Sequence, residues 1–156
     1  MQLAFEAPDQ PDVIALIRDL DAYQDELYPP ESRHTVDIST LAQPNVLFAV
    51  ARDGAGAVGG CGAIVLGAGF GELKRMYVHP RCRGQGMGRA LIELLEGEAP
   101  RRGCTLIRLE TGPYQPEALG LYERMGYTRR TPFGKYTDDP LSVFMEKQLS
   151  PAATKA

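Results

Sequence analysis

The sequence predicts an α/β fold in which one domain holds a mixed sheet of about six strands. Three observations support this prediction. The chain has 156 residues, which is enough to enclose one hydrophobic core. Its composition, 44% hydrophobic and 24% charged, is that of an ordinary globular protein. Segments with helical and strand patterns follow one another in the order helix, strands, helix, strand, helix, strand, and no internal repeat interrupts them.

The first half of the chain is expected to form two helices and three strands. Five apolar residues near one helical face predict a helix over residues 11–28: Val13, Ile14, Ile17, Leu20 and Leu27. Two prolines then open a loop, and a short second helix is expected within residues 37–44. β-Branched and aromatic residues predict a strand after Asn45, and a glycine-rich turn joins it to a hairpin partner over residues 57–66. A further strand over residues 71–80 stops at Pro80.

The second half is expected to form two helices, each followed by a strand. A glycine stretch leads into a helix that ends near Gly97, and its buried stripe is Met87, Leu91, Leu94 and Leu95. A strand over residues 105–111 precedes a helix whose stripe is Ala118, Leu121, Tyr122 and Met125. Gly126 is the expected C-terminal stop of that helix. The last strand is expected over residues 142–147, and the tail after it is expected to be disordered.

Composition and charge argue against several classes of function. The net charge of −3 gives no basic field of the kind that nucleic-acid-binding proteins carry. No apolar run approaches the ~18 residues of a membrane span, and the N-terminal segment lacks a signal-peptide pattern. Three widely spaced cysteines, Cys61, Cys82 and Cys104, fit neither a disulfide framework nor a zinc site. We therefore expect a cytoplasmic protein without a metal, bound to neither nucleic acid nor membrane.

The most informative stretch is RCRGQGMGRALIELLEGEA, in which three glycines alternate directly ahead of a helix: Gly84, Gly86 and Gly88. A helix N-terminus presents unpaired N–H groups and partial positive charge. Glycines before it let these N–H groups approach an anion without interference from Cβ atoms. Three arginines add positive charge around the loop: Arg81, Arg83 and Arg89. The stretch therefore predicts a loop that holds a diphosphate.

Three phosphate-binding designs compete for this stretch. A Walker A loop needs a Lys-Ser or Lys-Thr pair after its glycines, and the sequence has neither there. A dinucleotide fingerprint needs GxGxxG, but Arg89 occupies the third glycine's position, where close helix packing requires glycine. The third design, R-x-x-G-x-G, is matched by residues 83–88.

With that motif the sequence resembles the GNAT superfamily of acyl-CoA N-acyltransferases. The resemblance rests on MYVHPRCRGQGMGRALIELLE and, later in the chain, on ALGLYERMGY, in the order and spacing typical of the superfamily. It covers roughly residues 3–149 as one N-acetyltransferase domain, with residues 150–156 as a tail. Small bacterial members are the most similar. The resemblance implies a mostly antiparallel sheet of about six to seven strands flanked by about four helices.

The resemblance also implies acetyl-CoA as the co-substrate and no metal. Amides of the glycine loop would bind the pyrophosphate, and the pantetheine arm would pair with the splayed end of the preceding strand. A backbone N–H of that strand would meet the acetyl carbonyl. The coenzyme-binding residues expected are Met76, Tyr77, Val78, Arg83, Gly84, Gln85, Gly86, Met87, Gly88 and Arg89. A glycine-rich turn without a ligand is the alternative.

For the chemistry, the resemblance implies direct attack of an amine on the thioester in a ternary complex, without a covalent acyl-enzyme. Tyr122 is expected to protonate the leaving thiolate, because members of the superfamily place a tyrosine near the coenzyme sulfur. A tyrosine that only packs in the core is the alternative. Glu72 is the expected base, and strand alternation places it on the same face as Lys74 and Met76. Glu110 is the second candidate for the base.

The acceptor is expected to be a primary amine of a small molecule or a peptide. His34 and Glu110 are candidates for lining the acceptor cleft, with an exposed surface histidine as the alternative for His34. Two other functions compete. A non-catalytic acyl-CoA-binding module would need neither Tyr122 nor the acids, and the missing third glycine argues against a nucleotide-binding oxidoreductase. Homodimers are common in the superfamily, but this sequence does not indicate one.

Overall fold

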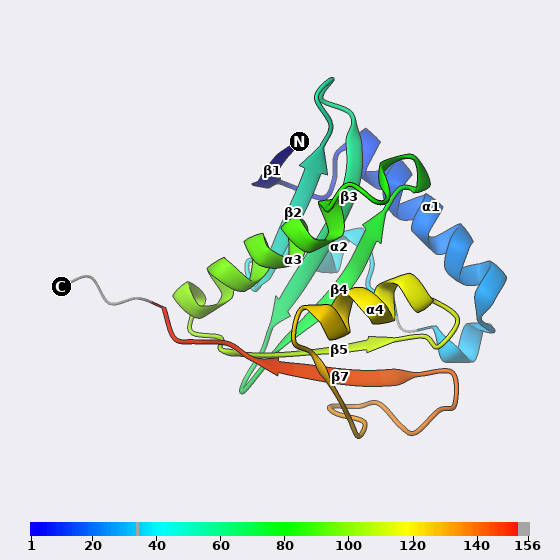
Figure 1. The fold of residues 1–156 in the computed structure, drawn as a ribbon, viewed down its shortest axis with the longest axis vertical. Helices are drawn as coiled ribbons and strands as arrows, with labels where there is room; N and C mark the ends of the chain where they lie inside the picture. The colour runs from blue at the N-terminus through cyan, green and yellow to red at the C-terminus, as the bar shows by residue number, and fades with distance from the viewer. Residues whose placement is uncertain (34, 153–156) are drawn as a thin grey trace.

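A seven-stranded sheet with helices on both faces forms the computed structural model of the chain, which describes residues 1–33 and 35–152 (Figure 1). In spatial order the strands run β1-β2-β3-β4-β5-β7-β6. Neighbouring strands are antiparallel except β4 and β5, which are parallel. The strands are β1 (Gln2–Phe5), β2 (Val46–Arg52), β3 (Val58–Leu66), β4 (Gly71–Val78), β5 (Leu106–Thr111), β6 (Thr128–Arg130) and β7 (Val143–Gln148). This confirms the predicted mixed, mostly antiparallel α/β fold.

Helices cover both faces of the sheet (Figure 1). α1 (Pro11–Leu27) and α2 (Ile38–Leu41) pack on one face, and α3 (Met87–Glu98) and α4 (Pro116–Arg124) pack on the other. The predicted helices are present with similar boundaries, since their apolar stripes mark which face of each helix is buried. No helix in the described part of the chain is long and apolar enough to cross a membrane. Residues 153–156 of the predicted tail lie outside the described residues.

Two short strands were not predicted from the sequence. β1 has four residues and pairs with β2 at one edge of the sheet, and β6 has three residues and pairs with β7 at the other edge. Segments this short carry too few residues to show the two-residue alternation of a strand. Tertiary pairing, rather than local pattern, therefore defines both edges.

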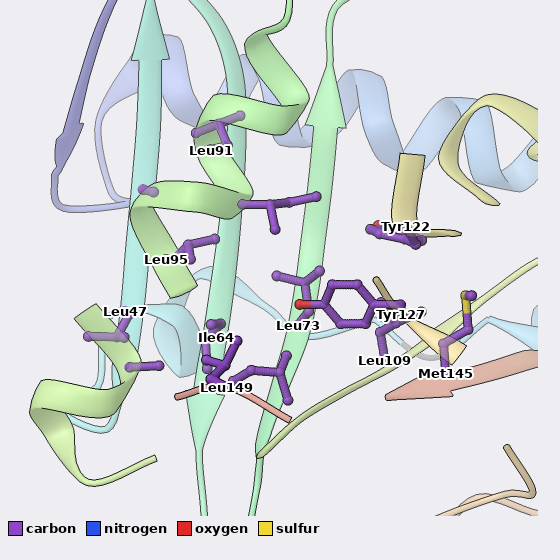
Figure 2. Close-up of a cluster of buried hydrophobic side chains, with 14 of the residues drawn as sticks. Leu47, Ile64, Leu73, Leu91, Leu95, Leu109, Tyr122, Tyr127, Met145 and Leu149 are labelled. Atoms are coloured by element: carbon purple, nitrogen blue, oxygen red, sulfur yellow. The ribbon is translucent and has the colours of Figure 1, made fainter. Parts of the chain in front are cut away.

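The larger core cluster lies between α3 and the sheet (Figure 2). α3 buries Met87, Leu91, Ile92 and Leu95. The predicted stripe was nearly right, but it included Leu94, which is only partly buried, and omitted Ile92, which is fully buried. A wider apolar face explains the difference, because a helix that packs on a sheet buries more than one narrow row of side chains.

β4 and β5 stay together for only three residue pairs. Gly71–Leu73 pair with Ile107–Leu109, and beyond that point the two strands diverge (Figure 1). A register shift in β4 accompanies the divergence: Cys61 faces Tyr77, whereas Ala63 faces Lys74. The extra residue of this bulge adopts a left-handed conformation, with φ of +57° at Arg75. Bulges of this kind bend a strand and increase its twist, so β4 turns away from β5.

The α3 core provides a direct test of the fold. Leu91 is completely buried, and Leu91→Ala should lower the free energy of unfolding by about 2–5 kcal/mol through the lost burial and the cavity left behind. Glu93→Ala, on the exposed side of the same helix, should change it by no more than about 0.5 kcal/mol. Urea denaturation of both variants measures the difference, and equal losses would contradict the placement of α3 on the sheet.

Candidate active site

The three alternating glycines serve two different structural purposes. Gly84 and Gly86 have φ of +75° and +79°, a conformation that side chains with a Cβ rarely adopt. Gly88 has no such φ, but a Cβ there would lie only 3.0 Å from Leu121 Cδ2 of α4. The first two glycines therefore shape the loop, and the third lets α3 approach α4 closely.

The loop ends at a helix N-terminus whose amides have no intrahelical acceptor. Gly86 is the N-cap of α3 and has no side chain to cap it. The first intrahelical bond runs from Ala90 N to Gly86 O at 3.0 Å. The N–H groups of Met87, Gly88 and Arg89 therefore remain available, as an anion-binding loop requires.

A groove of about 480 Å³ opens in front of this helix N-terminus. Its walls come from α1, the end of β4, the glycine loop and α4. It is lined by the residues predicted to bind the coenzyme, with the exception of Gln85: Met76, Tyr77, Val78, Arg83, Gly84, Gly86, Met87, Gly88 and Arg89. The structure thus brings together residues that the sequence analysis selected from two separate elements, a strand and a loop.

Only some of the arginines around the loop face the groove. Arg83 lies over the rings of Tyr23 and Tyr77, with its Cζ 5.7 Å and 5.9 Å from their centroids. Arg89 lines the groove as well and pairs with Glu93 on the exposed side of α3. Arg81 is bound elsewhere, to Asp53 and to the carbonyl of Val58. The positive charge in the groove therefore comes from Arg83 and Arg89, joined by Arg124 of α4.

The end of β4 presents backbone groups to the groove. His79 N donates to Gly59 O at 2.8 Å, and Gly60 lies opposite Val78. Bonded and non-bonded pairs alternate along an antiparallel ladder, so the N–H and C=O of Val78 point away from β3. The Val78 carbonyl accepts a bond from Arg83 Nε at 3.1 Å. The diverging strand therefore leaves the N–H of Val78 on an edge that can pair with an extended ligand.

A second, smaller cavity of about 80 Å³ adjoins the groove. It lies where β4 and β5 separate, with α1 and its following loop on one side. The two cavities share four lining residues: Met76, Gln115, Ala118 and Tyr122. A ligand in the groove and a second ligand in the small cavity would therefore meet beside these four side chains.

Tyr122 is buried at the junction of the two cavities, with its ring packed against Tyr127 (Figure 2). Burial is the main cause that raises the pKa of its hydroxyl, and the charge of Glu110 adds to it. The hydroxyl is therefore protonated at neutral pH. No residue in the described ranges 1–33 and 35–152 accepts a hydrogen bond from it, so it can donate to a ligand.

Glu110 lines the small cavity from the end of β5. Burial raises the pKa of its carboxyl from 4.5 to about 7. Lys74 and the nearby Ser142 oppose this rise, although the Ser142 Oγ does not reach hydrogen-bonding geometry. A carboxylate whose pKa is close to neutral pH is suited to accept a proton.

Glu72 does not line either cavity. Its Oε2 accepts a 2.5 Å hydrogen bond from Tyr136 and lies 3.1 Å from Lys74 Nζ. The prediction that Glu72, Lys74 and Met76 share one face is confirmed for Glu72 and Lys74 but was wrong for Met76, because the bulge at Arg75 interrupts the alternation of β4. Met76 instead joins the core cluster beneath α3 and lines both cavities. The other predicted acceptor residue, His34, lies outside the described residues.

Sequence reasoning missed several residues of the site. Gln115 lines both cavities, and Arg33 and Tyr28 line the small one. The Tyr28 hydroxyl accepts a bond from Tyr114 N at 3.1 Å, and it occupies the space that a Cβ on Gly112 would need. Gly112, directly after the strand predicted over residues 105–111, was therefore a sequence signal that another element packs closely there.

Comparisons with known proteins agree with this geometry. The model of the "Acetyltransferase (GNAT) family" matches residues 13–127. The chain is 49% identical to the "IAA acetyltransferase" of Azospirillum brasilense over 94% of this chain and 97% of that relative. It is 36% identical to the "Uncharacterized N-acetyltransferase YsnE" of Bacillus subtilis over 78% and 82% of the two chains. A putative acyl-CoA N-acyltransferase from Klebsiella pneumoniae superposes with a TM-score of 0.81 and 43% identity over 96% and 97% of the two chains.

The raised pKa of Glu110 has a consequence for stability. Below pH 4.5 the Glu110 carboxyl is protonated in both the folded and the unfolded protein. Above that pH the unfolded protein loses this proton more readily than the folded one, so the free energy of unfolding falls, and the loss is complete once the pH has risen through about 7. Glu110→Gln, which stays neutral, should therefore raise the free energy of unfolding at pH 8 by about 1–3 kcal/mol and leave it nearly unchanged at pH 4.

Glu72→Gln is the matched control. It replaces a paired carboxylate that accepts a hydrogen bond, so it should lower stability at pH 8. Denaturant unfolding at both pH values measures these effects. A destabilised Glu110→Gln variant at pH 8 would contradict the burial of an unpaired carboxyl at this position.

Proposed function

The chain belongs to the acetyltransferase (GNAT) family and is an acetyltransferase, and on this premise we propose that it transfers the acetyl group of acetyl-CoA to the primary amine of a small molecule. Family membership places it among enzymes rather than among non-catalytic acyl-CoA-binding modules. One observation carries the proposal: a long groove and a small cavity meet at Tyr122. This arrangement suits two substrates whose reacting atoms must come together.

The long groove suits the coenzyme. The free amides of Met87, Gly88 and Arg89 would bind the diphosphate, and Arg83 would add a charged donor. A Cβ on Gly84 or Gly86 would meet no protein atom within 4 Å, so the space before the loop is open to a ligand. The pantetheine arm would follow the free edge of β4 at Val78 and bring the thioester to Tyr122.

The small cavity suits the acceptor, and Glu110 is the base that we propose in place of Glu72. An ammonium group beside Glu110 would lose a proton to the carboxylate and become a nucleophile. The amine nitrogen would attack the thioester carbon, with no covalent acyl-enzyme. As the carbon–sulfur bond breaks, Tyr122 would donate its proton to the thiolate.

Ligand-dependent stabilisation tests the choice of coenzyme. The melting temperature of the protein should rise with acetyl-CoA and CoA and stay unchanged with NAD and ATP, because a ligand at ~100 times its dissociation constant adds ~2.7 kcal/mol. Release of free CoA in the presence of candidate amines then tests the transfer. IAA, the compound in the relative's name, is assayed separately, beside that panel of amines.

Gly86→Val should reduce the affinity for acetyl-CoA by at least ~100-fold. Valine is strained at φ of +79°, and its side chain would project into the space proposed for the diphosphate. Gly97→Val, in the same helix with open space around it and an ordinary φ, is the control and should bind normally. Calorimetric titration of both folded variants decides this point, and unchanged affinity of Gly86→Val would remove the diphosphate from this loop.

Tyr122→Phe should lower kcat by ~10²–10⁴-fold, the usual contribution of a general acid. The KM for acetyl-CoA should change little, because this hydrogen bond strengthens only as charge develops on sulfur. Tyr127→Phe is the control: its hydroxyl donates to Glu96 Oε2 at 2.8 Å, away from both cavities. Steady-state kinetics with an amine that the enzyme acetylates measure both variants. Equal activity of the two would mean that Tyr122 only packs in the core.

A further inference from the structure

The wall of the small cavity carries more positive than negative charge. Three cationic side chains line it, Arg33, Lys74 and Arg75, against one carboxyl, that of Glu110. The partners of the cations, by contrast, are absent from the wall: Asp25 for Arg33, Glu72 for Lys74 and Asp21 for Arg75. In each of these pairs, therefore, the cationic member lines the cavity and the carboxylate does not.

The three cationic side chains differ in how many contacts with other protein groups hold them in place. Arg75 is almost completely buried, donates from Nε to Val36 O at 3.0 Å and pairs with Asp21 at 2.5 Å. Lys74 Nζ lies 3.1 Å from Glu72 Oε2 and donates a hydrogen bond to the Tyr136 hydroxyl at 2.5 Å. Both side chains are held in place by several contacts, which makes them part of the framework of the cavity.

Arg33 differs because one of its N–H donors has no acceptor among the described residues. Its Nη1 pairs with Asp25, whose side chain is 57% exposed and therefore screened by water. Its Nε is buried, and no acceptor for it exists among residues 1–33 and 35–152. A buried N–H of a charged group without an acceptor is costly, so a native protein rarely keeps one without a reason. The Arg33 side chain lines the cavity, and its ion-pair partner among the described residues is the exposed Asp25, so an anionic group of a ligand there would give the guanidinium a second partner.

The size of the cavity limits the ligand. A volume of about 80 Å³ corresponds to roughly six water-sized spheres, since one needs ~10–15 Å³ on this measure. Glu110 and Tyr122 lie on the same wall as Arg33. A small molecule can therefore present an amine to Glu110 and Tyr122 and an anion to Arg33 at the same time.

We propose that the acceptor is a small amine that also carries a carboxylate, as a free amino acid does, and that Arg33 binds this carboxylate and determines the specificity. The inference rests on the proposed function, because it assigns the acceptor of that same site. Carboxylate geometry matches the donor fork of a guanidinium, which can offer two N–H groups together.

Matched substrates test the proposal without any mutation. Each of the twenty amino acids is compared with its carboxamide, which keeps the amine and side chain but loses the negative charge. Release of CoA from acetyl-CoA is the readout. At least one amino acid should be acetylated with a kcat/KM ten-fold or more above that of its amide.

Variants then assign the preference to Arg33. Arg33→Gln should raise the KM for the amino acid by about 10–100-fold and leave kcat/KM for the amide within about three-fold of wild type. Asp25→Asn is the matched control: it removes the partner of Arg33 but keeps the guanidinium, so the preference for the amino acid should persist. A variant that was merely less well folded would lose both substrates equally.

The possible results separate this inference from the proposed function. Equal turnover of acids and amides, or an unchanged preference in Arg33→Gln, would overturn the role of Arg33 while acetyl transfer stands. Binding of acetyl-CoA without acetylation of any amino acid would also overturn it. Failure of the protein to bind acetyl-CoA at all would overturn the proposed function and, with it, this assignment of the acceptor.

Discussion

The separation of β4 from β5 shapes both the groove and the small cavity. The two strands share only three residue pairs before the bulge at Arg75 turns β4 away. A fully paired sheet would satisfy the groups of Val78 with another strand and would close the space between its two faces. Because the strands diverge, one side of the sheet can hold a long ligand on the free edge, and the small cavity opens between the strands from the side of α1.

Burial at this opening raises the pKa of two ionisable groups, Tyr122 and Glu110. It raises the pKa of the Tyr122 hydroxyl, which therefore keeps its proton, and it raises the pKa of the Glu110 carboxyl to about 7, where it can accept one. Both shifts have the same first cause, loss of hydration, because each charged form is disfavoured away from water. A pair with separated proton affinities is typical of acid and base partners in enzymes. The same burial is the reason to expect lower stability above neutral pH, where the Glu110 carboxyl ionises.

The loop and the helix after it could be predicted from the sequence, because the relevant signals are local. The glycine pattern around Gly86 and the apolar stripe of α3 each lie within a few residues, and the structure places that loop at a groove. The choice between Glu72 and Glu110 depended on long-range geometry instead. A bulge formed by arginine at positive φ has no clear sequence signal, so strand alternation gave the wrong face for Met76. The spare donor of Arg33 was equally hidden, since it depends on a loop packed against two distant strands.

A crystal structure with a non-hydrolysable acetyl-CoA analogue would show whether the groove holds the coenzyme. The diphosphate should contact the N–H groups of Met87, Gly88 and Arg89. The pantetheine arm should follow β4 past Val78, and the sulfur position should lie within hydrogen-bonding distance of the Tyr122 hydroxyl. An analogue bound outside the groove, or bound there with its sulfur position far from Tyr122, would contradict the claim that the divergence of β4 and β5 creates the site of acetyl transfer.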